Sequence, residues 1–400
     1  MSARYPAECS PPMDSAKLLA REGDAKHAAT IALHAGFVVA GVIASLLGPV
    51  LPMLIARWSL SDERAGLFFT AQFCGSMAGV ASVSVLIPWR GYKLPHVIGF
   101  TFMAIGVALL NMGSESAGLF AAALFGYGLG LIIAATNLWI AEVAGARRGA
   151  ALSILNLAWG IGAVACPPLV MFAQLRHGVP ALLFGIAGIS LVIALILVAV
   201  HTEPHSGRNG GALTSVAYPT VSKQTALALG LLFFLYVGSE SSIGGWIAAF
   251  AKRMGTVRGN QWTLAPMFFW AGLIAGRALV PAMLSRIREN KLMAFGLLLA
   301  GIGDAALLEM RTFRGMVGCA VLIGLGFANI YPLLVACLVR SFGDRAKSVG
   351  SAMFALAALG GASMPWLVGV ASTKLGGLHA GLLVPLAGCL AMIGLLRLLD

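Results

Sequence analysis

Apolar runs of roughly 20 residues recur along this chain from His27 onward, and they constrain its fold more than any other feature. One such run is long enough to cross the hydrocarbon core of a bilayer as a helix. Only 10% of the 400 residues are charged, against about 25% in soluble domains. The sequence therefore predicts an all-α membrane protein that crosses the bilayer many times.

Charged residues, glycine and proline divide the chain into twelve predicted spans. The spans cover residues 28–56, 63–88, 94–112, 116–143, 149–175, 179–200, 225–251, 261–285, 291–310, 315–339, 348–373 and 380–399. Residues 1–26 have no apolar stretch and are expected to form a disordered N-terminal tail. The polar residues 202–224 are expected to be a flexible linker between an N-terminal six-helix bundle, 27–201, and a C-terminal one, 225–400.

The basic residues predict the orientation of these spans. With an even number of spans, both termini and the linker share a side, and that side holds 17 of the 27 Lys and Arg residues. The other side holds 9, and Arg277 lies inside a span. The positive-inside rule then places the termini and the linker in the cytoplasm, with the protein in the inner membrane.

Several classes of function find no support in the sequence. The net charge of +12 comes from short loops instead of a basic stripe mixed with aromatic residues, which argues against nucleic-acid binding. The six cysteines show no zinc or redox spacing, so neither a metal nor another cofactor is expected. No nucleophile–base arrangement or phosphate-binding loop is present, which argues against an enzyme and against an ATP-driven pump.

The two predicted bundles echo each other in three places. The stretch LFFTAQFCGSMAG from Leu67 is similar to MFFWAGLIAGRAL from Met267, and GYGLGLIIAATN before Asn137 is similar to LIGLGFANIY around Asn329. The next span in each half has a glycine-rich stretch that ends in proline, GIGAVACPPLV and GGASMPWLV. Weak internal symmetry of this kind is typical of duplicated transporters, whose binding site lies between the bundles near the bilayer midplane.

The motifs also resemble those of a known family, from about His34 to the end of the chain. YVGSESSIGGW at Tyr236–Trp246, FWAGLIAGRALV at Phe269–Val280 and the region from NIYPLLVACLVRSFGDRAKSVG onward are similar to the major facilitator superfamily. Within it they resemble the fucose/glucose/galactose permease branch. The resemblance implies two pseudo-symmetric bundles of six transmembrane helices that move a small polar solute, most simply a sugar, by alternating access, with possible proton symport, as a monomer among membrane lipids.

Two departures from that branch concern proton coupling. The resemblance aligns Gly48 and Ile133 with positions where the branch carries acids in its first and fourth helices. The usual acidic loop motif after the second helix is replaced by LIPWRGYK. Coupling through those positions is therefore not expected, and either another acid carries the proton or the protein is an uncoupled facilitator.

Ionisable side chains at membrane depth are rare and usually functional. Glu240 lies in a serine- and glycine-rich stretch and is expected to accept hydrogen bonds from substrate hydroxyls, to carry a proton, or to pair with a neighbour such as Arg277. It is the first candidate for proton coupling, followed by His34 and Asp304. His34 is also consistent with a neutral hydrogen-bonded histidine, and Asp304 with a structural pair or a gate.

A neutral polyol needs amide and hydroxyl partners together with aromatic faces. The side chains of these types that we expect to contact substrate are Gln72, Asn137, Asn156, Trp159, Glu240, Trp246, Trp270, Asn329 and Tyr331. Each of them is equally consistent with a hydrogen bond between helices. The expected cavity contains Glu240 and Asn329 together with Trp159 or Trp270.

Charged residues near the cytoplasmic ends are candidates for gate salt bridges, although a solvated loop remains an alternative. They are Glu142, Arg147, Arg148, Arg277, Arg340, Asp344 and Arg345. For Arg277, ligand binding is the second interpretation. On the same fold, an exporter of drugs or amphipathic lipids remains the main competing function, since Met, Phe and Ala are abundant.

Overall fold

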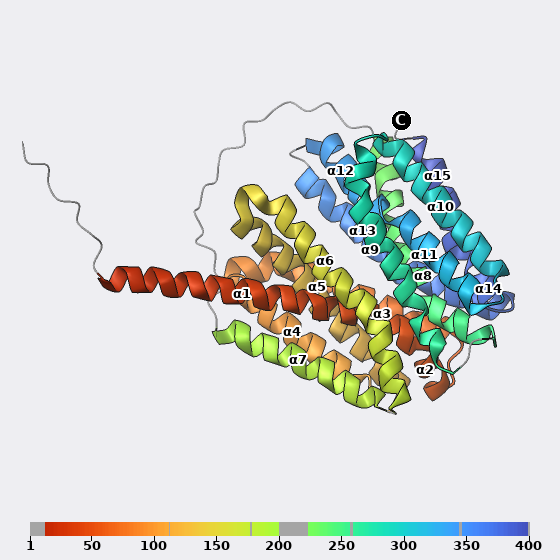
Figure 1. Ribbon diagram of the computed structural model, residues 1–400, viewed down its shortest axis with the longest axis horizontal. Helices are drawn as coiled ribbons and strands as arrows, with labels where there is room; N and C mark the ends of the chain where they lie inside the picture. The colour runs from red at the N-terminus through yellow and green to blue at the C-terminus, as the bar shows by residue number, and fades with distance from the viewer. Residues whose placement is uncertain are drawn as a thin grey trace, which may run out of the picture.

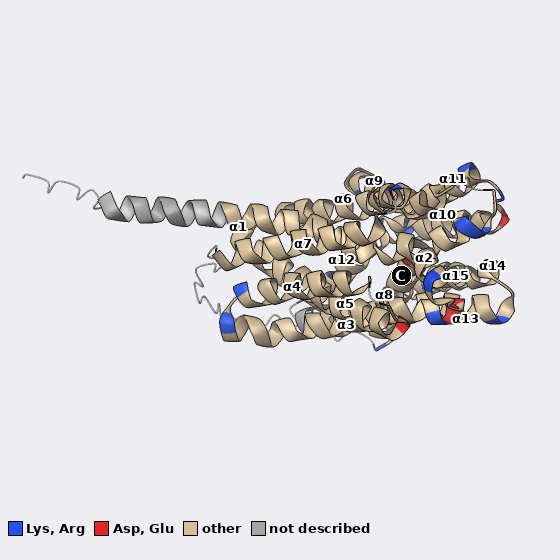
Figure 2. Cartoon of the chain, turned by 90° about the horizontal axis from the view of Figure 1, so that it is seen from below, with Lys and Arg blue, Asp and Glu red and all other residues tan. Residues whose placement is uncertain are grey.

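The structure is a computed structural model that describes residues 13–111, 113–176, 178–199, 223–256, 259–343 and 346–398. Within these ranges the regular elements are all helical (Figure 1). Most Lys, Arg, Asp and Glu residues lie at the ends of the helical body, and its middle is largely uncharged (Figure 2). This distribution is the one that a bilayer requires.

The first half of the chain forms helices α1 to α7. Their bounds are α1 Met13–Ser45, α2 Leu47–Trp58, α3 Asp62–Arg90, α4 Lys93–Leu109, α5 Glu115–Ala144, the 3-10 turn η1 Gly145–Arg147, α6 Arg148–Leu175 and α7 Val179–Ala199. We expected a disordered tail over residues 1–26, but α1 already begins at Met13. Residues 15–21, SAKLLAR after Asp14, are mostly good helix formers, so a polar composition did not prevent the helix from extending.

The second half forms helices α8 to α15. Their bounds are α8 Lys223–Arg253, the 3-10 turn η2 Gln261–Leu264, α9 Ala265–Leu284, α10 Glu289–Glu309, α11 Phe313–Phe327, α12 Ile330–Phe342, α13 Ala346–Leu375, α14 Leu378–Gly381 and α15 Leu383–Leu396. Most of the expected linker, from residue 202 to residue 222, lies outside the described residues.

Eleven helical segments of the described chain are long and apolar enough to cross a membrane. The twelfth crossing is α4, an apolar helix of 17 residues that packs against α5 and α7. The predicted fold of twelve spans is thereby confirmed. We define the terminal end as the end of the helical body where α1 and α8 begin, and the opposite end as the end where α2 and α8 finish.

The helices pack in the same way in each half. In the first half α3 packs on α5, α4 on α5 and α7, and α1 on α6. In the second half α9 packs on α11, α10 on α11 and α15, and α8 on α13. When the seventh span is matched with the first, the eighth with the second and so on, each packed pair of helices in the first half has an equivalent pair in the second half. The pseudo-symmetry predicted from the sequence echoes is thereby confirmed.

Two predicted spans are broken near their middle. The first breaks at Leu46 and the tenth at Ala328, each of them four or fewer residues before a proline, Pro49 and Pro332. Proline has no amide hydrogen and cannot bond the carbonyl of the residue four positions earlier, which interrupts the helix. The break at Leu46 brings Ser45 and Gly48 to the interface between the halves.

The halves meet through a limited set of helices. The helix α3 packs on α13, α2 on α8, and α6 on α9 and η2. In Figure 1 the halves converge near α2 and diverge toward α12 and the start of α1. The hydrogen bonds that join them lie between the middle of the body and the opposite end, where the side chain of Thr70 donates to the Ala362 carbonyl at 2.7 Å and that of Thr263 to Gln174 at 2.9 Å.

Candidate functional site: a cavity between the two halves

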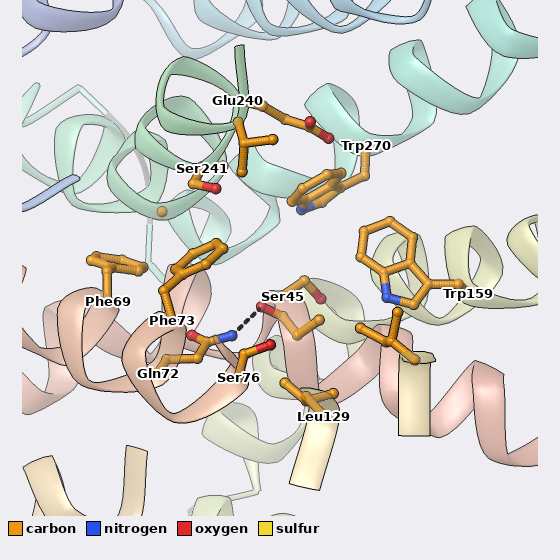
Figure 3. Close-up of a pocket in the computed structure, with 16 residues that line it drawn as sticks. Ser45, Phe69, Gln72, Phe73, Ser76, Leu129, Trp159, Glu240, Ser241 and Trp270 are labelled. Atoms are coloured by element: carbon orange, nitrogen blue, oxygen red, sulfur yellow. Dashed lines mark hydrogen bonds between the residues drawn. The ribbon is translucent and has the colours of Figure 1, made fainter. Parts of the chain in front are cut away.

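A cavity of about 210 Å³ lies between the halves near the middle of the membrane-spanning body. Its walls come from α1, α2, α3, α5 and α6 of the first half and from α8 and α9 of the second (Figure 3). The serine- and glycine-rich stretch of α8 contributes most of the second half's wall, because small side chains leave room there. This is the position predicted for the binding site of a duplicated transporter.

Two tryptophans from different halves form one side of the cavity. The rings of Trp159 and Trp270 meet edge to face with their centroids 5.6 Å apart. The indole nitrogen of Trp270 points into the cavity, and it is buried without a hydrogen-bond partner (Figure 3). This N–H is thus a free donor for an occupant, and the two ring faces can pack on an apolar or CH-rich surface.

The polar groups of the first half come from α1 and α3. The Gln72 side-chain amide donates to the Ala44 carbonyl at 3.3 Å, which fixes the amide and leaves its oxygen as an acceptor. The Ser45 hydroxyl donates to the Gly41 carbonyl of its own helix at 3.0 Å. The first half therefore offers polar groups without any net charge.

Glu240 is the one ionisable residue among those that line the cavity. Its carboxylate faces Arg277 of α9, with 4.0 Å between Oε1 and Nη2. The rings of Tyr236 and Tyr331 lie beside this pair, with their centroids 5.9 Å apart, and Tyr236 is fully buried. Glu240 thus has both properties that we considered: it lines the cavity and it faces Arg277.

Four of the nine expected substrate contacts line the cavity, namely Gln72, Trp159, Glu240 and Trp270. The other five lie elsewhere for identifiable reasons. Asn137 and Asn156 each donate to a carbonyl of their own helix, that of Ile133 at 2.7 Å and that of Leu152 at 2.9 Å.

The remaining three expected contacts belong to the interior of the second half. Asn329 donates to the Leu292 carbonyl at 3.1 Å, so our prediction that it shares the cavity with Glu240 is wrong. Trp246 is fully buried and donates to the Pro365 carbonyl at 2.8 Å. Tyr331 packs its ring against Phe233 and Tyr236, next to the Glu240–Arg277 pair but outside the cavity lining.

The two alternative candidates for proton coupling also lie away from the cavity. His34 contacts the Thr30 carbonyl of its own helix through Nδ1 at 2.8 Å, as expected for a hydrogen-bonded histidine. Asp304 is 1% exposed, and neither of its carboxyl oxygens has a hydrogen-bond partner. Its surroundings on α11 and α15 include the thiols of Cys319 and Cys389, so the expected structural pair is not formed there.

The expected gate clusters at the terminal end are arranged differently from the prediction. Glu142 accepts a hydrogen bond from the Tyr92 hydroxyl at 2.7 Å, while Arg147 and Arg148 are exposed. Burial and this hydrogen bond raise the pKa of Tyr92, which keeps its hydroxyl a donor. Arg340 forms an ion pair with Glu289 of the same half. Asp344 and Arg345 lie outside the described residues.

A network at the opposite end was missed by the sequence analysis. The guanidinium of Arg253 donates two hydrogen bonds to Asp62, at 2.7 and 2.5 Å, and the Ser372 hydroxyl donates to the same carboxylate at 2.5 Å. The amide of Glu63 donates to the Thr373 hydroxyl at 3.0 Å. These contacts join α3 of one half to α8 and α13 of the other, and we call them the Asp62–Arg253 lock. The signal available in the sequence was that opposite charges occupy helix ends on the same side of the membrane in different halves.

A second buried polar contact was also missed. His96 is fully buried and its Nε2 lies 3.1 Å from the Thr136 hydroxyl, which joins α4 to α5. His96 stands only four residues after the loop residue Tyr92, so its sequence position suggested an exposed helix end.

The two positions that the resemblance aligned with acidic residues are both at the cavity. Gly48 and Ile133 both line the cavity. The first half of this cavity carries no ionisable group among its lining residues.

Comparisons with known proteins agree with this architecture. Residues 33–365 match the family model described as Major Facilitator Superfamily. The chain is 27% identical to a glucose/galactose transporter of Brucella abortus, over 91% of this chain and 92% of that protein, and 24% identical to the glucose/mannose transporter GlcP of Bacillus subtilis, over 84% and 86%.

Solved structures share the fold at lower identity. A D-xylose-proton symporter superposes with a TM-score of 0.76 at 16% identity, covering 93% of this chain and 97% of its own. A bacterial homolog of the human lysosomal transporter Spinster, in an inward-facing and occupied conformation, gives 0.71 at 16% identity, covering 98% and 97%. The matched family model covers most of the chain, and this protein belongs to the Major Facilitator Superfamily.

Proposed function

We propose that this protein is a secondary transporter that moves a small neutral polar solute by alternating access, and that its main substrate is a sugar. The observation that carries the proposal is the cavity between the halves, which Glu240, Gln72 and Trp270 line together with the Trp159 ring. A carboxylate and an amide oxygen accept hydrogen bonds from hydroxyl groups, and the indole N–H donates one. The CH surface of a sugar ring packs on the aromatic faces.

The size of the cavity supports a small solute. Its volume of about 210 Å³ is below the range of about 300–1,000 Å³ that is typical of pockets for drug-sized ligands. The relatives named glucose/galactose transporter and glucose/mannose transporter match nearly the whole chain, which supports a hexose as the first substrate to test.

The orientation follows from the charge distribution. We place the terminal end in the cytoplasm and the protein in the inner membrane, because the basic residues are concentrated on that side. The Asp62–Arg253 lock then closes the extracellular side, which supports an inward-facing conformation. Transport requires that the lock opens while the halves close at the cytoplasmic side.

An exporter of drugs or amphipathic lipids is the second candidate, and one observation favours it. Phe69, Phe73, Leu129 and Ile133 give the cavity a mostly apolar wall. An amphipathic substrate would use these side chains, whereas a sugar would use the polar groups opposite them.

Uptake of a labelled hexose into proteoliposomes tests the proposal. We expect saturable uptake that unlabelled hexose competes for, together with unchanged drug resistance in cells that produce the protein. Absence of hexose uptake combined with increased drug resistance would instead support the exporter.

A further inference from the structure

The Glu240–Arg277 pair is the centre of charge at the site. Glu240 is the one ionisable side chain in the cavity lining, and Arg277 stands behind it on the neighbouring helix, 4.0 Å away. Both side chains keep part of their surface exposed, 14% for Glu240 and 30% for Arg277. The opposite charge at this distance favours the ionised form of each partner. When both partners are ionised, the pair has a net charge of zero.

The pair is close enough to cancel charge but is not closed into a hydrogen-bonded bridge. The Nε–H of Arg277 is buried without a hydrogen-bond partner. A purely structural salt bridge in a bilayer would satisfy this donor. The carboxylate thus remains available to the cavity while Arg277 balances its charge.

Among the residues that the structure describes, no other charged side chain lies at the cavity beside the Glu240–Arg277 pair. The three other ion pairs, Arg64–Glu115, Arg253–Asp62 and Arg340–Glu289, lie at the ends of the helical body. Asp304 faces cysteine thiols on α11 and α15 and does not line the cavity.

We infer that Arg277 is a specificity-determining residue, which neutralises Glu240 so that the cavity selects electrically neutral solutes over anionic and cationic ones of the same shape. The inference rests on the proposed function for the identity of the solute, but the charge balance is a property of the site alone. Arg277 acts through Glu240 and is absent from the cavity lining.

Replacing either partner with a neutral residue should therefore shift the preference of the cavity from neutral solutes to charged ones, with a sign that depends on which partner is removed. Glu240→Gln leaves the guanidinium unbalanced and should favour anions. Arg277→Gln leaves the carboxylate unbalanced and should favour cations. The double variant Glu240→Gln/Arg277→Gln should return to the neutral preference, a result that loss of a structural contact cannot produce.

Collisional quenching of tryptophan fluorescence tests the charge balance without any substrate, because Trp159 and Trp270 line the cavity. Iodide, caesium and neutral acrylamide are compared in the purified full-length protein, and a Trp159→Phe/Trp270→Phe protein gives the background of the other tryptophans. Relative to acrylamide, we expect iodide quenching to rise at least twofold in Glu240→Gln, caesium quenching to rise similarly in Arg277→Gln, and both to return to wild-type values in the double variant. Unchanged ratios in a folded Glu240→Gln protein would overturn the inference.

Binding of three sugars of one shape then tests the selectivity. Glucose, glucuronate and glucosamine, the last at a pH where its amine is protonated, are titrated by the same fluorescence. We expect wild type to prefer glucose, Glu240→Gln to gain at least tenfold for glucuronate relative to glucose, and Arg277→Gln to gain for glucosamine. If wild type binds none of the three while the quenching ratios shift as expected, the sugar proposal fails and the charge balance stands. If wild type binds glucose and the variants keep its order of preference, the inference about Arg277 fails and the sugar proposal stands.

Discussion

At the scale of single residues, the site depends on which buried polar groups are left without a partner. The Trp270 N–H points into the cavity unpaired, whereas the Trp246 N–H is satisfied by the Pro365 carbonyl. Both tryptophans lie in the second half and both are buried. The same side chain is therefore a binding group in one place and a structural group in the other.

These two tryptophans make a matched pair for mutation. Trp270→Phe keeps an aromatic ring but removes the free donor, and we expect the KM for substrate to rise about two- to tenfold, the value of one net hydrogen bond. Trp246→Phe leaves the Pro365 carbonyl unpaired and should lower the Tm, at a cost of about 1–3 kcal/mol, with little change in KM. Transport kinetics and thermal unfolding of both variants check this, and the opposite assignment of effects would contradict it.

Coupling to protons is also decided by single side chains. Arg277 balances Glu240, and His34 is bonded to its own helix, whereas Asp304 is buried with two unpaired oxygens. A carboxyl group at membrane depth without a partner is costly and is usually retained for function. The structure therefore moves our first candidate for proton coupling from Glu240 to Asp304.

Asp304→Asn tests this assignment. We expect the variant to lose accumulation of substrate driven by a pH gradient while exchange of labelled for unlabelled substrate continues, because exchange needs no net proton movement. The Tm should not fall, since the amide removes no contact of the carboxyl group. His34→Gln is the control that should still accumulate substrate. Accumulation by Asp304→Asn, or its absence in wild type, would show that Asp304 is not the carrier.

Residue type and depth predicted part of the site but could not predict all of it. They identified Gln72, Trp159, Glu240 and Trp270. They failed for Asn137, whose amide bonds the preceding turn, because depth along a helix does not give the rotation of a side chain around it. Partners from distant segments, such as Pro365 for Trp246, were likewise invisible before the helices were placed.

At the scale of helices, the sequence echoes mark close helix contacts. Gly126 and Gly130 of α5 pack against the backbone of α3 at Gln72 and Ser76, and Gly324 of α11 packs against α9 at Phe269 in the same manner. Small residues let membrane helices approach closely. The repeated glycines thus predicted which helices pack closely. The breaks at Leu46 and Ala328 were not predicted, although Pro49 and Pro332 indicated them.

Two glycines of α11 provide a direct test of this packing. A Cβ at Gly324 would overlap the Phe269 carbonyl of α9, whereas a Cβ at Gly318 would meet no atom of a neighbouring helix within 4 Å. We expect Gly324→Ala to destabilise the protein by about 1–3 kcal/mol. Gly318→Ala should be neutral or stabilising by up to about 1 kcal/mol, since alanine favours the helix. Equal Tm values for the two variants would contradict the close α9–α11 contact.

At the scale of the whole molecule, the Asp62–Arg253 lock holds one of the two end states of a rocking motion. The lock joins the halves, whereas the ion pair of Arg64 with Glu115 at the same end lies within the first half. Only contacts between the halves change when one half rocks against the other. Removing the lock should therefore shift the conformational equilibrium, and removing the second pair should not.

Asp62→Asn should populate the state that is open at the opposite end. Arg253 is 41% exposed, so we expect the shift to be about 1 kcal/mol, or roughly fivefold in the ratio of states. Spin labels at Ser116 and Arg311, one in each half at that end, report the change as a longer distance in a cysteine-free background. Glu115→Gln is the control, and an equal shift in both variants would show that the lock has no special role.

The central claim is that the cavity beside Glu240 is the substrate site and that it opens at the cytoplasmic side in this conformation. Ser241 lines the cavity next to Glu240, so Ser241→Cys in a cysteine-free background places a single thiol there. A membrane-impermeant thiol reagent is applied to inside-out and to right-side-out vesicles, with and without hexose. We predict faster labelling in inside-out vesicles and protection by hexose. Labelling at equal rates from both sides, or labelling that hexose does not slow, would contradict the account.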